Sequence, residues 1–208
     1  TLVIFRADVF QITKGLFSDL RGPEWQFSLK IVLSMIPAAL VGVLFSKELE
    51  LLFDRQILLV GAMLWLTGIL LFIADRAQNT ERDVTYSHAL VIGLAQAIAI
   101  LPGISRSGAT ISTSVILGID RTRAAKFSFL MVVPLIFGKI AKDLIDGGFQ
   151  VESGEMTVLA AGFVAAFATG LVACQWMISL VRRAQLRYFS YYCFTVGGLA
   201  AGYALFVQ

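Results

Sequence analysis

The segment from Pro102 to Thr110, which reads Pro-Gly-Ile-Ser-Arg-Ser-Gly-Ala-Thr, gathers the residue types that can bind an anion. Its arginine, Arg106, is the only charged residue between Asp83 and Asp120. An arginine inside a long apolar stretch is costly unless it is paired, and it indicates a functional site. Its planar guanidinium can hold two phosphate oxygens at once. The segment therefore predicts a site for a phosphate group.

The other polar groups of this segment can also donate hydrogen bonds to an anion, and none of them is acidic. The two glycines allow backbone N–H groups to turn toward a ligand. We expect a helix to begin at Ala109, which would point the positive end of its dipole at the same place. The predicted phosphate-binding residues are Gly103, Ser105, Arg106, Ser107, Gly108 and Thr110.

A structural interpretation of the same residues competes with the anion site. In it, Arg106 donates to carbonyl oxygens that a broken helix leaves free. The hydroxyl groups alone would be a weak indication, because serine and threonine often donate to carbonyls of their own helix. Their grouping with an arginine and a helix break favours the anion site.

The elements that must position this segment are predicted to be membrane helices. Of the 208 residues, 58% are hydrophobic and 15% are charged, and the mean hydropathy is +0.81. The apolar residues come in long runs with the charges between them, which is typical of membrane spans. The predicted fold class is all-α, a polytopic membrane helix bundle. The net charge of +3 is small, and the basic residues lie in short loops. They therefore indicate the orientation of the chain in the membrane rather than nucleic-acid binding.

Five segments are predicted to be spans: Phe27 to Ser46, Gln56 to Ala74, Lys126 to Ile140, Met156 to Leu180 and Tyr188 to Val207. Two segments, Lys47 to Arg55 and Asp75 to Asp83, are predicted to be polar connections. The opening Thr1 to Phe5 is too short to cross a bilayer. We interpret it as the tail of a helix that begins before this sequence.

The segment from Val84 to Ile119 fits neither one span nor two. At about 1.5 Å per residue, one helix over Tyr86 to Gly118 would be longer than a hydrocarbon core of about 30 Å. Two spans need about 40 residues, and Pro102 and Gly103 break the middle of the segment. We therefore predict a re-entrant helix-loop-helix over residues 84–119. Its tip lies near the membrane midplane, where irregular backbone must line a cavity or be buried in protein.

The distribution of basic residues supports this hairpin. If it returns to its own side, one face of the membrane holds ten basic residues: Lys14, Arg21, Arg76, Arg82, Arg121, Arg123, Lys126, Arg182, Arg183 and Arg187. The other face then holds four: Lys47, Arg55, Lys139 and Lys142. A single crossing would instead leave six against eight. The positive-inside rule favours the first arrangement, with the hairpin entering from the cytoplasmic side.

The segment from Pro102 to Thr110 resembles the second signature of the undecaprenyl-diphosphate phosphatase family, the bacitracin-resistance proteins. That signature, proline-glycine-x-serine-arginine-serine-glycine-x-threonine, is matched at every fixed place. Other residues are also similar to the family: Ile36-Pro37-Ala38, Gln96, Phe127 to Leu130, Pro134 and Gly138. The resemblance covers essentially the whole chain.

The resemblance implies an inverted-repeat fold, in which each half has a re-entrant hairpin followed by three spans. Residues 1–208 would form a single membrane domain, with 1–83 the remainder of the first repeat and 84–208 the second repeat. The first hairpin, which in the family carries a glutamate-rich motif and a motif with serine and histidine, is absent from this sequence. We therefore expect an incomplete form, the C-terminal part of the fold, which binds phosphate without turnover.

By resemblance, the function is hydrolysis of undecaprenyl diphosphate to undecaprenyl phosphate and phosphate in the bacterial plasma membrane, which recycles the lipid carrier for cell-wall synthesis. Arg106 and Ser105 are then the catalytic residues. Arg106 neutralises phosphoryl oxygens in the transition state, and Ser105, with Ser107 and Thr110, orients them.

The implied partners are the polyprenyl diphosphate substrate and membrane lipids, and the oligomeric state stays open, a homodimer included. A divalent cation such as Mg²⁺ or Ca²⁺ would suit this chemistry, but no metal ligands are evident in the sequence.

The alternative function is a lipid-phosphate flippase or an anion transporter with a phosphate site at the membrane midplane. Transporters also use broken helices whose N-termini point at an anion. His88 is the only histidine. It is assigned no catalytic role, because it would lie roughly 20 Å from Arg106 along a helix.

Overall fold

Every regular element of the described chain is an α-helix. The computed structural model describes residues 1–18, 22–53, 56–78, 80–145 and 156–207, and no strand occurs among them. The helices are α1 (Arg6–Ser18), α2 (Pro23–Leu44), α3 (Ser46–Phe53), α4 (Ile57–Arg76), α5 (Tyr86–Ile98), α6 (Arg106–Ile116), α7 (Arg121–Leu130), α8 (Val132–Ile145), α9 (Met156–Arg182) and α10 (Arg187–Val207). The all-α prediction is confirmed.

Four segments of the described chain are long and apolar enough to cross a membrane: Pro23–Leu44, Ile57–Arg76, Arg121–Ala141 and Met156–Arg182. The chain is therefore a multi-pass membrane protein. These segments correspond to four of the five spans predicted from the sequence. The remaining predicted span, in α10, is not among them.

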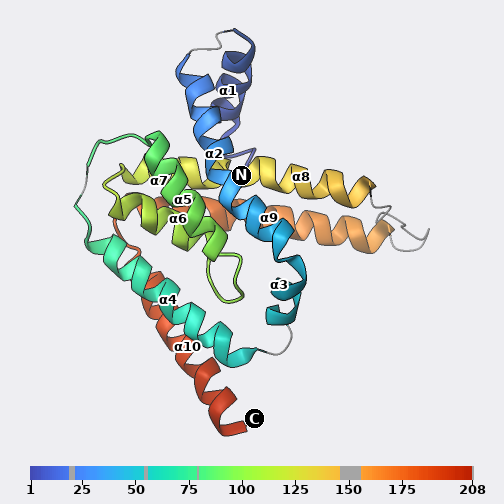
Figure 1. Ribbon diagram of the computed structural model, residues 1–208, viewed down its shortest axis with the longest axis vertical. Helices are drawn as coiled ribbons and strands as arrows, with labels where there is room; N and C mark the ends of the chain where they lie inside the picture. The colour runs from blue at the N-terminus through green and yellow to red at the C-terminus, as the bar shows by residue number, and fades with distance from the viewer. Residues whose placement is uncertain (19–21, 54–55, 79, 146–155, 208) are drawn as a thin grey trace.

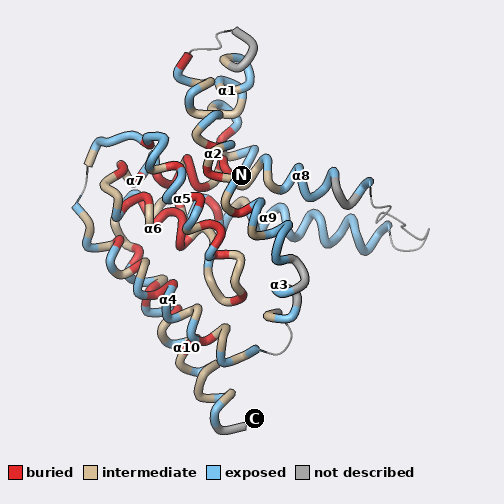
Figure 2. The backbone as a smooth tube through the Cα atoms, in the orientation of Figure 1, coloured by how far each residue is buried: buried red, intermediate tan, exposed pale blue. Residues whose placement is uncertain are grey.

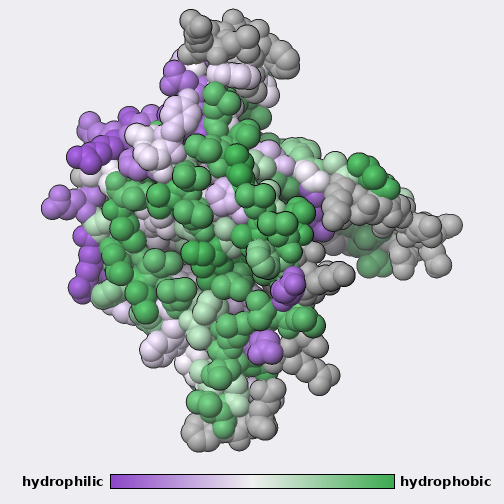
Figure 3. Space-filling view, in the orientation of Figure 1, coloured by the Kyte–Doolittle hydropathy of each residue, from purple (hydrophilic) through white to green (hydrophobic). Residues whose placement is uncertain are grey.

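The hairpin of α5 and α6 packs against α2 through α5 and against α4 through α6 (Figure 1). Buried residues concentrate in α5, α6 and α7, whereas α8 and α9 project from the rest and are mostly exposed (Figure 2). Hydrophobic residues cover most of the face shown in Figure 3, and hydrophilic residues gather near the segment that links α4 to α5. An apolar outer surface is what contact with lipid requires.

Helices α4 and α10 pack along each other at close range because glycines face the contact. A Cβ atom at Gly61 would lie 2.9 Å from the carbonyl oxygen of Gly197. The Ser190 hydroxyl donates to the carbonyl oxygen of Gly68 at 2.7 Å. Small residues and hydroxyl-to-backbone bonds of this kind hold membrane helices together. Helix α10 therefore holds α4 in place, and α6 packs on another side of α4.

The two ends of the hairpin segment meet at one place. The backbone N–H of Asp120 donates to the carbonyl oxygen of Arg82 at 3.0 Å, and the Thr80 hydroxyl donates to that of Gly118 at 2.6 Å. The guanidinium of Arg121, a buried residue, donates to three carbonyl oxygens at the end of α4: those of Ala74, Asp75 and Ala77. The chain thus returns, after α5 and α6, to the level at which it left α4.

Two predictions about the N-terminal half were wrong. Thr1 to Phe5 is not a helix tail that ends there, because the backbone N–H of Val9 donates to the carbonyl oxygen of Phe5 at 2.8 Å and the chain continues into α1. The segment from Lys47 to Arg55 is not a loop over its whole length, because α3 occupies Ser46–Phe53. Leu49 and Leu52 stand three residues apart and so share one side of this helix, whereas Leu51 is exposed.

The predicted span that starts at Lys126 in fact belongs to a helix that begins at Arg121. The carboxylate of Asp120 accepts a hydrogen bond from the backbone N–H of Arg123 at 2.9 Å and so caps this helix. Two of the basic residues in the charge distribution, Arg21 and Arg55, lie outside the described residues.

We expect the loops at the two ends of the hairpin to lie on the same, cytoplasmic side of the membrane. Single cysteines at Gln78 and Thr122, both exposed, can be introduced after Cys174 and Cys193 are replaced by alanine. Both should react with an impermeant maleimide from the same side, because the contacts described above join these two loops. Labelling from opposite sides would contradict the hairpin and the charge distribution that supports it.

Candidate anion site

The predicted anion-binding segment folds as a loop followed by the first turn of α6. Ser105 is the N-cap of this helix, and its hydroxyl oxygen accepts a bond from the backbone N–H of Gly108 at 3.1 Å. Helix α6 therefore begins at Arg106, and the prediction of a start at Ala109 was wrong. Because Ser105 caps the helix, Gly108 lies inside its first turn instead of before it.

The first turn of α6 concentrates positive potential. The N–H groups of Arg106 and Ser107 precede the first intrahelical bond, which runs from Ala109 to Ser105 at 2.8 Å, so they have no partner within the helix. Arg106 adds its charge at the first helical position, where the helix dipole opposes a cation. Among the described residues, none forms an ion pair or hydrogen bond with its guanidinium. An anion at this place would stabilise the arrangement.

Gly103 shapes the loop that precedes the turn. Its φ angle of +96° lies in the region that favours glycine. A Cβ atom at this position would lie 2.5 Å from the carbonyl oxygen of Val60 on α4. The loop therefore packs directly on the backbone of α4. Gly103 was predicted to bind phosphate, and the structure places it against α4 and outside the lining of the cavity described below.

Thr110 is buried and has a partner inside its own helix. Its exposed fraction is 1%, and its hydroxyl donates to the carbonyl oxygen of Arg106 at 3.0 Å. The hydroxyl proton is thus used within α6, as is common for threonine in helices. In this structure Thr110 stabilises the turn that carries Arg106.

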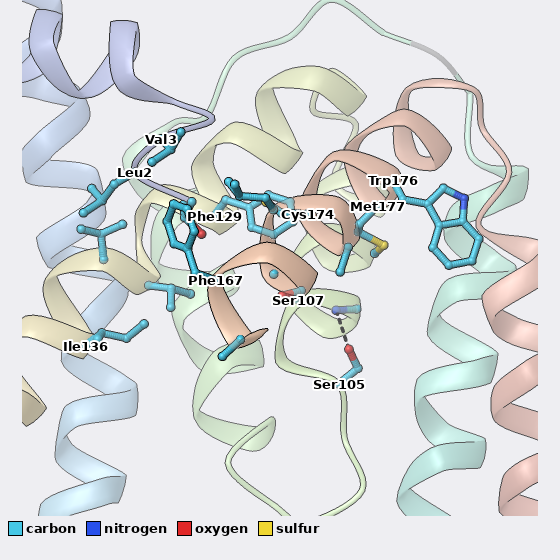
Figure 4. Close-up of a pocket in the computed structure, with 18 of the residues that line it drawn as sticks. Leu2, Val3, Ser105, Ser107, Phe129, Ile136, Phe167, Cys174, Trp176 and Met177 are labelled. Carbon is cyan, nitrogen blue, oxygen red and sulfur yellow. Dashed lines mark hydrogen bonds between the residues drawn. The ribbon is translucent and has the colours of Figure 1, made fainter. Parts of the chain in front are cut away.

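A cavity of about 890 Å³ opens beside this turn. Ser105, Ser107 and Gly108 form a polar part of its lining (Figure 4). The rest is mostly apolar and is contributed by the N-terminal residues 1–3 and by α4, α7, α8, α9 and α10, with residues such as Leu71, Phe129, Phe167, Trp176 and Met177. Among the described residues that line it, none is Asp, Glu or His. Such a cavity suits a ligand that is apolar along most of its length and anionic at one end.

Three of the six predicted phosphate-binding residues line this cavity, namely Ser105, Ser107 and Gly108. Arg106 lies between them in the chain but does not contribute to the lining. The sequence did not predict the cavity itself, because its apolar residues look like ordinary parts of separate spans. Only the packing of five helices brings them together.

His88 has a structural role at the start of α5. Its backbone N–H donates to the Thr85 hydroxyl at 3.2 Å, and the Thr85 N–H donates to Nδ1 of His88 at 3.4 Å. This capping box satisfies N–H groups at the helix start. It agrees with leaving His88 out of the predicted site.

The polar groups at the start of α6 suit an anion better than a metal ion. They are N–H groups, hydroxyls and a guanidinium, whereas Mg²⁺ and Ca²⁺ are held by carboxylate and carbonyl oxygens. Within the part of the chain that the structure describes, no group of three His, Cys, Asp or Glu residues could hold a metal ion.

Known proteins resemble this chain along almost its whole length. The family model described as bacitracin resistance protein BacA matches residues 1–199. The undecaprenyl-diphosphatase of Christiangramia forsetii is 60% identical over 197 residues, which cover 95% of this chain and 75% of the relative. That of Bacteroides fragilis is 42% identical over 204 residues, covering 95% and 76%. That of Methanobrevibacter smithii is 36% identical over 187 residues, covering 88% and 66%.

Proposed function

The chain belongs to the bacitracin resistance protein BacA family, and we propose that it hydrolyses undecaprenyl diphosphate to undecaprenyl phosphate and inorganic phosphate. The expectation from the sequence, that residues 1–208 bind phosphate without turnover, is tested by the phosphate-release assay below. This reaction recycles the lipid carrier of cell-wall synthesis. The observation that carries the proposal is the polar start of α6, with Ser105 and Ser107, inside an otherwise apolar cavity. The cavity accommodates the hydrocarbon part of the lipid, and the helix N-terminus attracts its diphosphate.

We assign the catalytic roles to Arg106 and Ser105, and phosphate binding also to Ser107 and Gly108. Hydrolysis breaks the bond between the terminal phosphorus and the bridging oxygen and forms a bond from that phosphorus to a water oxygen. One proton of that water stays on the released phosphate, and the other passes to the surrounding water. Negative charge then develops on the bridging oxygen. The N–H groups of the first turn stabilise this charge, because the helix orients them before the reaction begins. The Arg106 side chain starts from the same turn and adds its positive charge when the diphosphate is bound. Gly103 and Thr110 contribute indirectly, because they stabilise the loop and the first turn that orient these groups.

The alternative, a lipid-phosphate flippase or anion transporter, would use the same loop. The relatives named undecaprenyl-diphosphatase favour hydrolysis over transport. A divalent cation is assigned no residues, since the groups at the loop suit an anion.

We also propose that residues 84–119 are a re-entrant hairpin that enters the membrane from the cytoplasmic side. Residues 1–83 and 84–208 would then be two parts of one membrane domain. The hydrogen bond between Asp120 and Arg82, which closes the base of the hairpin, supports this arrangement. A segment of this length that begins and ends at one level can dip into a bilayer without crossing it.

The function is tested by measuring phosphate release from undecaprenyl diphosphate by the purified protein in detergent. Gly170→Trp should raise the KM for the lipid about tenfold, because the indole would occupy space that the apolar chain needs. Gly170 lines the cavity and has no other residue within 4 Å of a Cβ position. Gly162→Trp is the matched control, since Gly162 is on the same helix, has equally open surroundings and does not line the cavity.

Binding of the lipid without any phosphate release would contradict hydrolysis and favour the transporter. Phosphate release with the same KM in both tryptophan variants would retain the reaction but contradict the cavity as the lipid site.

A further inference from the structure

One residue of α4, Thr67, faces the proposed phosphate loop from outside the hairpin. Val60, Met63 and Thr67 follow each other at spacings of three and four residues, which places them on one face of the helix. Val60 and Met63 contact the loop at Gly103, and Thr67, with an exposed fraction of 0%, continues the same face. Among the described residues, Thr67 makes the hydrogen bond that joins the loop to another helix.

The hydroxyl group of Thr67 has two partners and therefore a defined direction. It donates to the carbonyl oxygen of Met63 at 3.1 Å. Because its proton is used there, its lone pairs are free to accept, and the backbone N–H of Ser105 donates to it at 3.2 Å. Ser105 is the N-cap of α6, so this bond acts on the residue that decides where the helix begins.

The methyl group of Thr67 meets the same turn. A Cβ atom on Gly108 would lie 3.3 Å from Cγ2 of Thr67 and 3.1 Å from the hydroxyl oxygen of Ser105. The first turn of α6 is thus hydrogen-bonded to Thr67 at its cap, and the Thr67 methyl group lies beside the space that a side chain at Gly108 would enter. Loss of the hydrogen bond would leave the direction of the Arg106 and Ser107 N–H groups to the loop alone.

We propose that Thr67 is a positioning residue for the phosphate site, an inference that rests on the proposed function. Thr67 does not line the cavity, and it acts through Ser105. Its hydroxyl holds the N-cap so that the first-turn N–H groups point at the diphosphate. Phosphoryl transfer depends steeply on such alignment, because a displacement of about 1 Å can cost about 100-fold in rate.

Three variants separate this role from helix packing. Thr67→Val keeps the shape and removes the acceptor, and Thr67→Ser keeps the acceptor and removes the methyl group. Ser190→Ala is the matched control, because it removes a hydroxyl that also bonds to α4, through the Gly68 carbonyl, on the side that faces α10. Each purified variant is assayed for kcat, KM, thermal stability and amide hydrogen exchange at Ser105 and Gly108.

We expect Thr67→Val to lower kcat about tenfold or more, with KM changed less than about threefold, while Thr67→Ser stays within about threefold of the parent kcat. Exchange at Ser105 should become faster in Thr67→Val alone. Ser190→Ala should lower thermal stability and leave kcat unchanged. If Thr67→Val keeps the parent kcat and the parent exchange at Ser105, the positioning role is wrong. If the parent protein releases no phosphate, the proposed function fails, and the exchange rates still decide whether Thr67 holds the N-cap.

Discussion

Replacing Arg106 with lysine should lower the rate of phosphate release from undecaprenyl diphosphate by at least about 100-fold, the scale of losing a preorganised charge donor. Lysine keeps the charge but loses the planar fork that holds two phosphate oxygens together. Arg106 stands at the first position of α6, and none of the described residues pairs with its side chain. Its contribution should therefore appear only when the anion is bound.

The matched variant for this test is Arg123→Lys. Arg123 also lies in the first turn of its helix, but its guanidinium forms an exposed ion pair with Asp83 at 3.7 Å. Exposed pairs of this kind contribute little, so turnover should stay at the parent level. Turnover close to that of the parent protein in Arg106→Lys would remove Arg106 from the site. Because no described residue pairs with this side chain, the thermal stability of Arg106→Lys should equal that of the parent protein. A loss of thermal stability would instead indicate a structural role.

The second large effect is expected from Gly103→Ala, which should prevent the loop from seating on α4. The φ angle of +96° is unfavourable for alanine, and its Cβ atom would lie 2.5 Å from the carbonyl oxygen of Val60, a backbone atom that cannot rotate away. Backbone strain and overpacking together should cost about 2–5 kcal/mol of folding free energy. Thermal unfolding in detergent, followed by phosphate release from the folded fraction, measures the two consequences.

Gly42→Ala serves as the control for this substitution. Gly42 lies in α2 and has no other residue within 4 Å of a Cβ position, so alanine meets neither strain nor contact there. Its stability should stay equal or rise slightly, because alanine favours helix more than glycine does. Equal stability of Gly103→Ala and the parent protein would show that the loop can leave α4 at little cost. The packing of the loop on α4 would then not determine the geometry of the anion site.

Part of this architecture follows from local sequence. Helices were predictable where long apolar runs stood between charges, because each run satisfies its backbone internally and meets lipid with its side chains. The break at Pro102 and Gly103 was equally visible, and the structure places a loop there, between α5 and α6. The grouping of Arg106 with serines and glycines predicted an anion site without reference to any neighbouring helix. Its phosphate chemistry remains a proposal that the variants above test.

Helix ends were less predictable than helix interiors. The start of α6 was misplaced because Gly108 was taken as part of the loop, whereas the Ser105 hydroxyl caps a helix that already includes it. The short helix α3 was taken for a charged connection. In both cases a few local hydrogen bonds decide the outcome, and composition carries little information about them.

The amino-acid sequence by itself determined that this is a multi-pass helical membrane protein with one polar, cationic break, since hydropathy and residue type act locally. Tertiary structure decided what surrounds that break. Packing on α4 placed Gly103 against Val60 and Thr67 against Ser105. Packing also joined side chains of five helices into one apolar cavity beside the first turn of α6. Such contacts link residues far apart in the chain. The sequence does not show which apolar residue of one helix packs against which residue of another, so the cavity could not be predicted from it.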